Sequence, residues 1–187
     1  MEFDCESEAL RMLGGELYNP LDSELVRLRA RASRMLARLG KESDGDKLIA
    51  GWQELFGEFG KNSIIRFPFI CDYGLNIFVG DSVFLNIGCV VLDCARVEIG
   101  SYTWIGPNVG IYTASHPLDW KLRREKQSAL PISIGSDVWI GGGSIILPGV
   151  SVGDRSVIGA GSVVTKSVPE GVVAAGNPCR VLRPLDT

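Results

Sequence analysis

The most restrictive feature of this 187-residue chain is its scarcity of histidine. His116 is the only one, so a zinc site of three histidines within one chain is excluded. Basic residues are not in excess either, because 19 Lys and Arg stand against 22 Asp and Glu, a formal net charge of −3. A general nucleic-acid binder usually carries a basic excess. We therefore expect no metal and no nucleic-acid partner.

Long hydrophobic runs and paired cysteines are also missing. No apolar stretch approaches membrane-spanning length, and the N-terminus, MEFDCESEAL, is acidic where a signal peptide is basic. The cysteines are odd in number and form no CxxC pair; they are Cys5, Cys71, Cys89, Cys94 and Cys179. Reduced thiols are the expected state. These absences favour a cytoplasmic protein with no membrane partner.

The N-terminal third of the sequence has a helical pattern. Apolar residues recur every three to four positions over residues 25–39, after a cap at Asp22 or Ser23 and before a stop at Gly40. A second apolar stripe, rich in aromatic residues, runs over residues 48–59. We expect this stripe to be buried, and the arginines of the first helix to form a solvated face.

The rest of the chain has a six-residue period. An aliphatic residue keeps phase at twelve positions, which are Val79, Leu85, Val91, Ile99, Ile105, Ile111, Ile134, Ile140, Ile146, Val152, Ile158 and Val164. Glycine follows seven of them, which indicates corners that need a positive φ or a side-chain-free approach between coils. Hexapeptide repeats are typical of parallel β-helices. We expect a helical segment over residues 1–61 and a mainly β domain, a parallel β-helix, over 62–187.

The period breaks between residues 112 and 133, YTASHPLDWKLRREKQSALPIS. This stretch carries charge and two prolines, so we expect a loop extruded from the β-helix. Long loops are more often functional than structural. His116, the single histidine, stands where the loop departs.

Five stretches, CDYGLNIFVGD, VVLDCARVEIG, GPNVGIYTASHPLD, IGSDVWIGGGSIILPGVSVGDRSVIGAGSVVTK and VVAAGNPCRV, resemble the maltose and galactoside O-acetyltransferases of the hexapeptide-repeat acyltransferase superfamily. GGELYNPLDSELVRLRARA resembles the helical N-terminal segment of that group. The resemblance implies a left-handed β-helix, a homotrimer, and direct transfer of acetyl from acetyl-CoA to a sugar hydroxyl. A histidine base would take the hydroxyl proton, with no metal.

The resemblance also implies roles for individual residues. His116 matches the catalytic histidine, although a lone histidine is otherwise a structural or surface residue. Asn86 matches a residue that stabilises the transition state and contacts the acceptor, although an asparagine that shapes a corner is the plain alternative. Asp72 and Asp93 match acceptor-binding positions, and solvated turn aspartates are their alternative. Where the galactoside type has an N-terminal aspartate, this chain has Asn19 and Pro20, with Asp22 as a possible substitute.

The coenzyme needs a groove and cations for its phosphates. The positions that match coenzyme-binding residues of the family are Gly142, Ala160, Thr165, Lys166, Arg180 and Arg183, and ordinary surface charge is the alternative for the cations. Trp104 and Trp139 hold the same place in their hexapeptides, so they share one edge, at a subunit interface or against the coenzyme.

The repeat phase separates the two catalytic residues. Asn86 is the eighth residue counted from Val79, and His116 is the eighteenth counted from Ile99, so they lie on different edges. A six-residue face spans roughly 20 Å at about 3.3 Å per residue. We therefore expect the active site to form between subunits.

Two alternatives to a sugar O-acetyltransferase stay open. One is the same chemistry on an antibiotic hydroxyl, a serine or an amino sugar, and the other is a non-catalytic β-helix that binds a partner.

Overall fold

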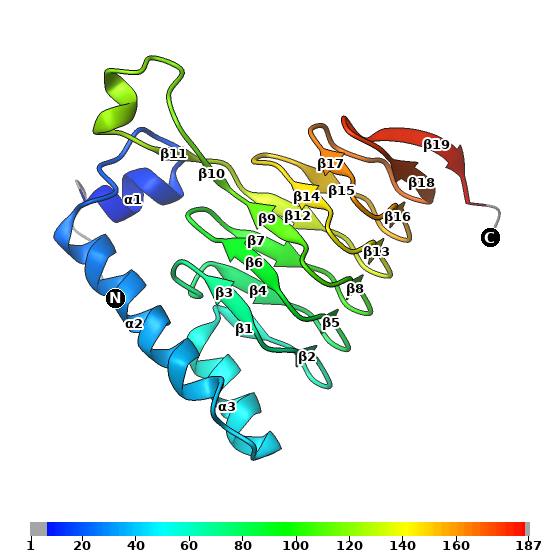
Figure 1. The fold of residues 1–187 in the computed structure, drawn as a ribbon, viewed down its shortest axis with the longest axis horizontal. Coiled ribbons are helices and arrows are strands. Elements are labelled where there is room, and N and C mark those ends of the chain that lie inside the picture. The colour runs from blue at the N-terminus through cyan, green and yellow to red at the C-terminus, as the bar shows by residue number, and fades with distance from the viewer. Residues whose placement is uncertain (1–6, 186–187) are drawn as a thin grey trace.

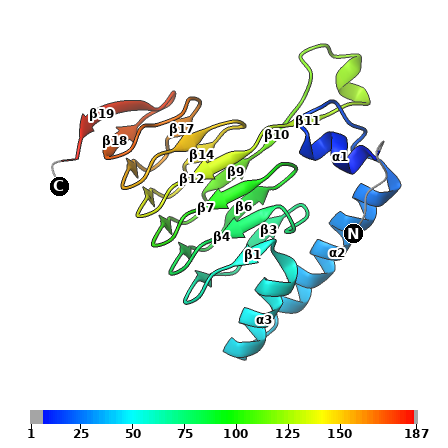
Figure 2. The ribbon, with the colours of Figure 1, turned by 180° about the vertical axis from the view of Figure 1, so that it is seen from behind.

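The computed structural model describes residues 7–185 as a stack of short strands with helices at one end (Figures 1 and 2). A long loop projects from the middle of the stack, and the last strand, β19 (Arg180–Pro184), lies at the end opposite the second and third helices. No helix among residues 7–185 is long and apolar enough to cross a membrane.

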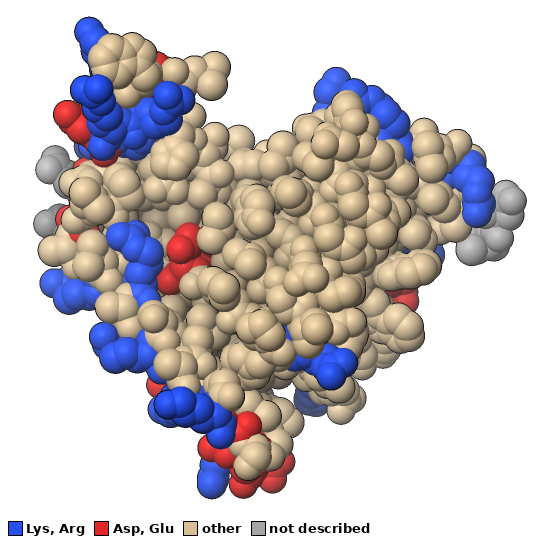
Figure 3. Space-filling model, viewed as in Figure 1, with Lys and Arg blue, Asp and Glu red and all other residues tan. Residues whose placement is uncertain are grey.

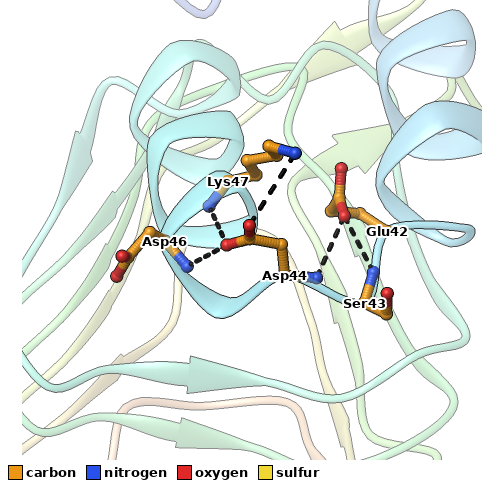
Figure 4. A network of polar contacts seen from close by, with 5 residues as sticks. All are labelled: Glu42, Ser43, Asp44, Asp46 and Lys47. Carbon is orange, nitrogen blue, oxygen red and sulfur yellow. Dashed lines mark hydrogen bonds and ion pairs between the residues drawn. The ribbon is translucent and has the colours of Figure 1, made fainter.

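The N-terminal segment contains three helices, each with a side-chain cap: α1 (Glu8–Leu13), α2 (Ser23–Leu39) and α3 (Gly45–Leu55). Asp22 caps α2 by accepting the backbone amides of Glu24 and Leu25, as expected. The start of α3 is fixed by the network in Figure 4, where Asp44 accepts the amides of Asp46 and Lys47 at 3.0 and 3.3 Å. Glu42, Ser43 and the Lys47 ammonium complete this network.

The strands form three faces of a parallel β-helix, and each coil contributes one short strand to each face. Face 1 contains β1 (Glu58–Phe59), β4 (Ile77–Val79), β7 (Val97–Ile99), β12 (Ile132–Ile134) and β15 (Ser151–Val152). Face 2 contains β2 (Ile64–Ile65), β5 (Phe84–Leu85), β8 (Trp104–Ile105), β13 (Trp139–Ile140), β16 (Val157–Ile158), β18 (Val172–Ala175) and β19 (Arg180–Pro184). Face 3 contains β3 (Phe69–Cys71), β6 (Cys89–Leu92), β9 (Gly110–Tyr112), β14 (Ile145–Ile146) and β17 (Val163–Val164).

The twelve aliphatic positions of the repeat all point into this β-helix. Each is at most 2% exposed, and each forms part of a ladder with the equivalent residues of the coils above and below. Val79, Ile99 and Ile134 are consecutive partners on face 1, for example. The predicted mainly β, hexapeptide-built parallel β-helix is therefore confirmed.

The glycines that follow the aliphatic residues are needed for close approach between coils. A Cβ on Gly141 would lie 2.4 Å from the backbone nitrogen of Ala160, and one on Gly106 would lie 2.6 Å from that of Gly142. None of the seven has a positive φ. The left-handed conformation occurs later in each corner, often at residues other than glycine, such as Tyr102 and Asp137. Of the two explanations that the sequence left open, side-chain-free approach is the one that the structure supports.

The aromatic stripe closes one end of the β-helix, but it is not all helical. Trp52 and Phe56 are buried at the end of α3 and pack on Phe69 of the first coil, with ring centroids 5.7 and 5.8 Å away. The helix ends at Leu55 and does not extend over the whole stripe to residue 59. Phe59 belongs to β1 because it stands 20 residues before Val79, directly beneath it on face 1. The β-helix thus begins at Glu58 and not at residue 62.

The break in the repeat forms the predicted extruded loop. Its root is a two-stranded antiparallel ladder of β10 (Ala114–Ser115) and β11 (Ser128–Ala129), and its tip contains the short 3-10 helix η1 (Leu122–Arg124). The loop is attached to the N-terminal segment by paired backbone hydrogen bonds between Tyr18 and Gln127, at 2.9 and 3.0 Å. The loop root therefore has a fixed position relative to α1 and the β-helix.

Candidate functional site

Two corners of the β-helix contain the residues singled out from the sequence. Edge 2–3 joins face 2 to face 3, and edge 3–1 joins face 3 to the next strand of face 1. Asn86 directly follows β5, so it lies on edge 2–3. His116 directly follows β10 in the loop that replaces the edge 3–1 corner of its coil. Face 3 separates the two residues, as the repeat phase predicts.

Asn86 is oriented by its own backbone neighbourhood. Its amide Oδ1 accepts the backbone N–H of Ile87 at 2.8 Å, and its backbone N–H donates to Ile105 at 2.9 Å. With Oδ1 engaged, the Nδ2 group is the part of the side chain left to donate a hydrogen bond. This arrangement suits a residue that stabilises a developing oxyanion.

A groove of about 450 Å³ runs along face 2 and edge 2–3 beside Asn86. Its walls include the side chains of Trp104 and Trp139, which are direct partners in neighbouring strands, and the backbone of Gly142 and Ala160. A Cβ on Gly142 would lie 3.0 Å from Pro107, so the glycine keeps the groove wide at this level. Two of the six predicted coenzyme residues thus share one groove with Asn86.

The other predicted coenzyme residues lie elsewhere. Thr165 and Lys166 are exposed and follow β17, so they lie on edge 3–1. Arg180 and Arg183 are exposed on β19, which pairs antiparallel with β18 at the end of face 2. Within one chain the structure therefore does not gather the six positions into one pocket.

Asp72 belongs to a polar cluster on edge 3–1. Its carboxylate Oδ2 accepts the thiol of Cys94 at 3.4 Å, and the Gln127 side chain donates to that sulfur at 3.8 Å. Burial raises the pKa of Cys94 to about 12, so the thiol is protonated and acts as a donor. Burial also raises the pKa of Asp72, and the Cys94 thiol and the Arg29 guanidinium oppose the effect.

Asp93 has a different environment from the one expected of an acceptor-binding residue. It is fully buried, and its carboxylate accepts the backbone amides of Asp72, Tyr73 and Asn76 at 3.0, 2.8 and 3.3 Å. Burial raises the pKa of Asp93 to about 7, against the effect of these amides. The residue organises the turn that contains Asp72, and its direct contact with an acceptor stays a prediction.

Several members of this cluster were not singled out from the sequence. Tyr18 is fully buried beside Cys94, and its hydroxyl has no hydrogen-bond partner among residues 7–185. Arg29 donates to the Tyr73 hydroxyl at 2.6 Å and is not part of a solvated helix face. Their sequence signal was weak, because they come from the N-terminal segment and meet the β-helix only in the fold. Asp22, the possible substitute acid, is engaged as the helix cap.

Metal ligands and reactive thiols are not part of this site. Residues 7–185 contain no group of three His, Cys, Asp or Glu side chains able to hold a metal ion. Cys71, Cys89, Cys94 and Cys179 are buried free thiols, and Cys5 lies outside the described residues. Burial raises the pKa of Cys89, which disfavours its use as a nucleophile.

Comparison with known proteins gives two family matches. Residues 11–60 match the maltose acetyltransferase hexapeptide capping motif, and residues 131–166 match the hexapeptide repeat of succinyl-transferase. The galactoside O-acetyltransferase of Escherichia coli K12 is 37% identical over 179 residues, which cover 94% of this chain and 88% of that protein.

Solved structures extend this similarity to the whole fold. A maltose O-acetyltransferase from Clostridium difficile 630 superposes with a TM-score of 0.95 at 42% identity, covering 98% of this chain and all of that one. A hexapeptide-repeat acetyltransferase of Vibrio cholerae, solved with acetyl-CoA, gives a TM-score of 0.90 at 40% identity, covering 97% and 100%.

Proposed function

The chain belongs to the hexapeptide-repeat acetyltransferases, and on that premise we propose that it transfers acetyl from acetyl-CoA to a hydroxyl group of a sugar. The donor is supported by the acetyl-CoA bound to the Vibrio cholerae relative. A sugar acceptor is supported by the maltose and galactoside acetyltransferases among the similar proteins. The N-terminal match to the maltose acetyltransferase capping motif supports the same choice.

His116 is the general base of the proposed reaction. Its imidazole takes the proton from the sugar hydroxyl as the oxygen attacks the thioester carbonyl. The Nδ2 group of Asn86 donates to the oxyanion that forms, and its collapse expels the thiolate of coenzyme A, which regains a proton from His116. No acyl-enzyme is required, in keeping with the burial of the described cysteines.

In this proposal, the sugar acceptor and acetyl-CoA bind to different residues of the two edges. Asp72, supported by Asp93 beneath it, accepts hydrogen bonds from sugar hydroxyls on edge 3–1. The pantetheine arm lies in the groove between Gly142 and Ala160. Thr165, Lys166, Arg180 and Arg183 hold the phosphates at the C-terminal end of the coils, where cations suit that charge.

The observation that carries this proposal is the division of the site between two edges. Asn86, Gly142 and Ala160 lie on edge 2–3, whereas His116, Asp72 and Lys166 lie on edge 3–1. One chain cannot bring the two sets together across face 3. Two copies can, if edge 2–3 of one faces edge 3–1 of the next. Such an interface joins two different surfaces and closes into a ring, and we propose a homotrimer with three equal sites.

The outer surface of face 2 supports contact between copies. Its outward residues are apolar in successive strands, and Ile64, Trp104 and Trp139 are 56%, 63% and 58% exposed. The outward residues of face 1 are mostly polar, including Glu58, Glu98 and Ser133. A contiguous exposed apolar stripe is typical of an interaction surface. This stripe borders the groove beside Asn86.

The test is release of free thiol from acetyl-CoA over a panel of neutral sugars, with His116→Ala measured in parallel. We expect turnover with a glucoside or galactoside and a loss of about 10²-fold or more in the variant. Normal folding of the variant is checked by its unfolding transition. Unchanged turnover in His116→Ala removes the proposed base, and no thiol release with any acceptor removes the proposed function.

A further inference from the structure

Basic residues are concentrated in two short segments of this acidic chain. Residues 27–38 contain five arginines and no acid, and residues 121–126, KLRREK, contain four cations and one acid. The rest of the chain holds ten cations against 21 acids. Figure 3 shows the result, with Lys and Arg gathered on the projecting loop and along α2. A surface with this separation of charge attracts anions to one side of the molecule.

The cations of the loop tip are exposed and lack carboxylate partners. Lys121, Arg123 and Arg124 form no salt bridge within residues 7–185, where the loop's one ion pair joins Lys126 to Glu8 at 3.8 Å. Arg124 and Lys121 instead lie against the Trp120 ring, 4.5 and 5.5 Å from its centroid. The indole holds two cations together without neutralising them.

The acceptor side of the site lies between these two groups of cations. The loop that carries Lys121 and Arg123 at its tip carries His116 at its root. On the other side, Arg29 of α2 reaches the turn of Asp72, where it donates to the Tyr73 hydroxyl. Any acceptor that approaches Asp72 and His116 passes this positive rim.

We propose that the rim formed by Lys121, Arg123 and Arg124 of the loop selects an acceptor with an anionic group, a saccharide that bears a phosphate, sulfate or carboxylate. This inference rests on the proposed function and specifies its acceptor class. The neutral part of the saccharide presents its hydroxyl to His116, and the anionic substituent lies against the rim. The coenzyme phosphates bind at the other end of the coils, so they do not account for these cations.

The experiment compares methyl glucoside with glucose 1-phosphate, because the two differ at the anomeric substituent and keep the other hydroxyls free. Affinity is measured by calorimetric titration of the intact oligomer, and kcat/KM by thiol release. Lys121→Gln with Arg123→Gln removes two rim charges and retains Arg124 on Trp120. Lys61→Gln with Arg155→Gln is the matched control, because it removes two exposed charges from the body of the β-helix.

We expect the unmodified protein to favour glucose 1-phosphate by about tenfold at low salt, as electrostatic focusing allows. The loop variant loses most of that preference, whereas its kcat/KM for methyl glucoside and its KM for acetyl-CoA are unchanged. The control variant keeps the full preference for glucose 1-phosphate. Raising the ionic strength from about 0.01 to 0.15 M also reduces the preference, because the Debye length falls from about 30 to 8 Å.

Four results overturn the inference. Two concern the saccharides: equal affinity for both, or a preference for glucose 1-phosphate that survives in the loop variant. The last two concern the loop variant itself: a raised KM for acetyl-CoA, or a changed oligomeric mass. The last two would assign the cations to the coenzyme or to a subunit interface. If neither saccharide is acetylated, the proposed function fails separately, and the titration still decides whether the rim binds the anionic group.

Discussion

Asn86 and His116 lie on opposite sides of face 3: Asn86 directly follows β5 of face 2, and His116 directly follows β10 at the loop root. In the proposed function, each chain therefore offers half of a site on each of two edges. The same division applies to the residues expected to hold coenzyme A. A site shared between copies would bring these two halves together.

Shared sites predict complementation between two inactive variants. Asn86→Ala and His116→Ala copies, produced together in equal amounts, form mixed rings in which some sites receive intact Asn86 from one copy and intact His116 from the next. In any mixed ring of three copies, one site in three meets this condition, so purified mixed rings recover about a third of wild-type turnover. Thiol release from mixed oligomers, purified through two different tags, measures this recovery.

The matched control mixes His116→Ala with His116→Gln copies, which cannot restore any site and remain inactive. Mixed oligomers of Asn86→Ala and His116→Ala that stay at the level of either variant alone would show that both residues serve the same copy.

How far the sequence determines this site depends on whether a residue belongs to the repeat. The positions of Asn86, Trp104 and Gly142 follow from the six-residue period, because a residue's phase fixes its corner or face. The roles of Tyr18 and Arg29 do not follow from it, since helical segments dock on the β-helix through contacts that no local pattern encodes. The boundary near residue 60 is ambiguous in the sequence for a related reason: Phe59 continues an aromatic helical stripe and is also in phase with Val79.

Because the coils pack closely, we expect that adding a single methyl group at Gly141 strongly lowers the free energy of unfolding. In Gly141→Ala, the new Cβ would lie 2.4 Å from the Ala160 nitrogen, a backbone atom that cannot move without shifting its coil. We expect a loss of about 1–3 kcal/mol or more in the free energy of unfolding, as for overpacked cores. Gly45→Ala is the control, because a Cβ there meets nothing within 4 Å at the start of α3.

Denaturant unfolding followed by far-UV circular dichroism measures both glycine variants. Gly45→Ala is expected to leave the free energy of unfolding unchanged or to raise it by about 0.5–1 kcal/mol, because alanine favours the helix. Equal stability of the two variants would show that the coils can separate to accept a side chain.

The buried carboxylate of Asp93 predicts that stability falls as the pH rises. Its folded pKa of about 7 lies above the unfolded value of about 3.9, so the folded state holds the proton more tightly. The resulting stabilisation is complete below about pH 4 and is lost as the pH rises to about 7. Asp72, whose pKa is also raised, acts in the same direction.

Asp93→Asn removes one of these titrating groups, so the difference in unfolding free energy between pH 4.5 and pH 7.5 becomes smaller than in the wild type. The absolute stability also falls, because the amide cannot accept all three backbone N–H groups. Asp154→Asn, at an exposed carboxylate that accepts the amide of Ser136, keeps the wild-type difference. An undiminished difference in Asp93→Asn would mean that Asp93 is not the group that titrates.

The apolar stripe of face 2 predicts the effect of a charge placed on it. Trp104→Glu puts a carboxylate beside Trp139, where contact with another copy would bury it without a partner. Because Trp104 is 63% exposed in the single chain, the substitution leaves the core of each β-helix intact. Light scattering should then show the 20.2 kDa chain in place of the proposed trimer, with unchanged circular dichroism and lost turnover. Ile49→Glu makes a comparable change at a residue of α3 that is 47% exposed, and it should leave the trimer and its activity intact. A Trp104→Glu protein that remains trimeric and active would show that copies meet through a surface other than face 2.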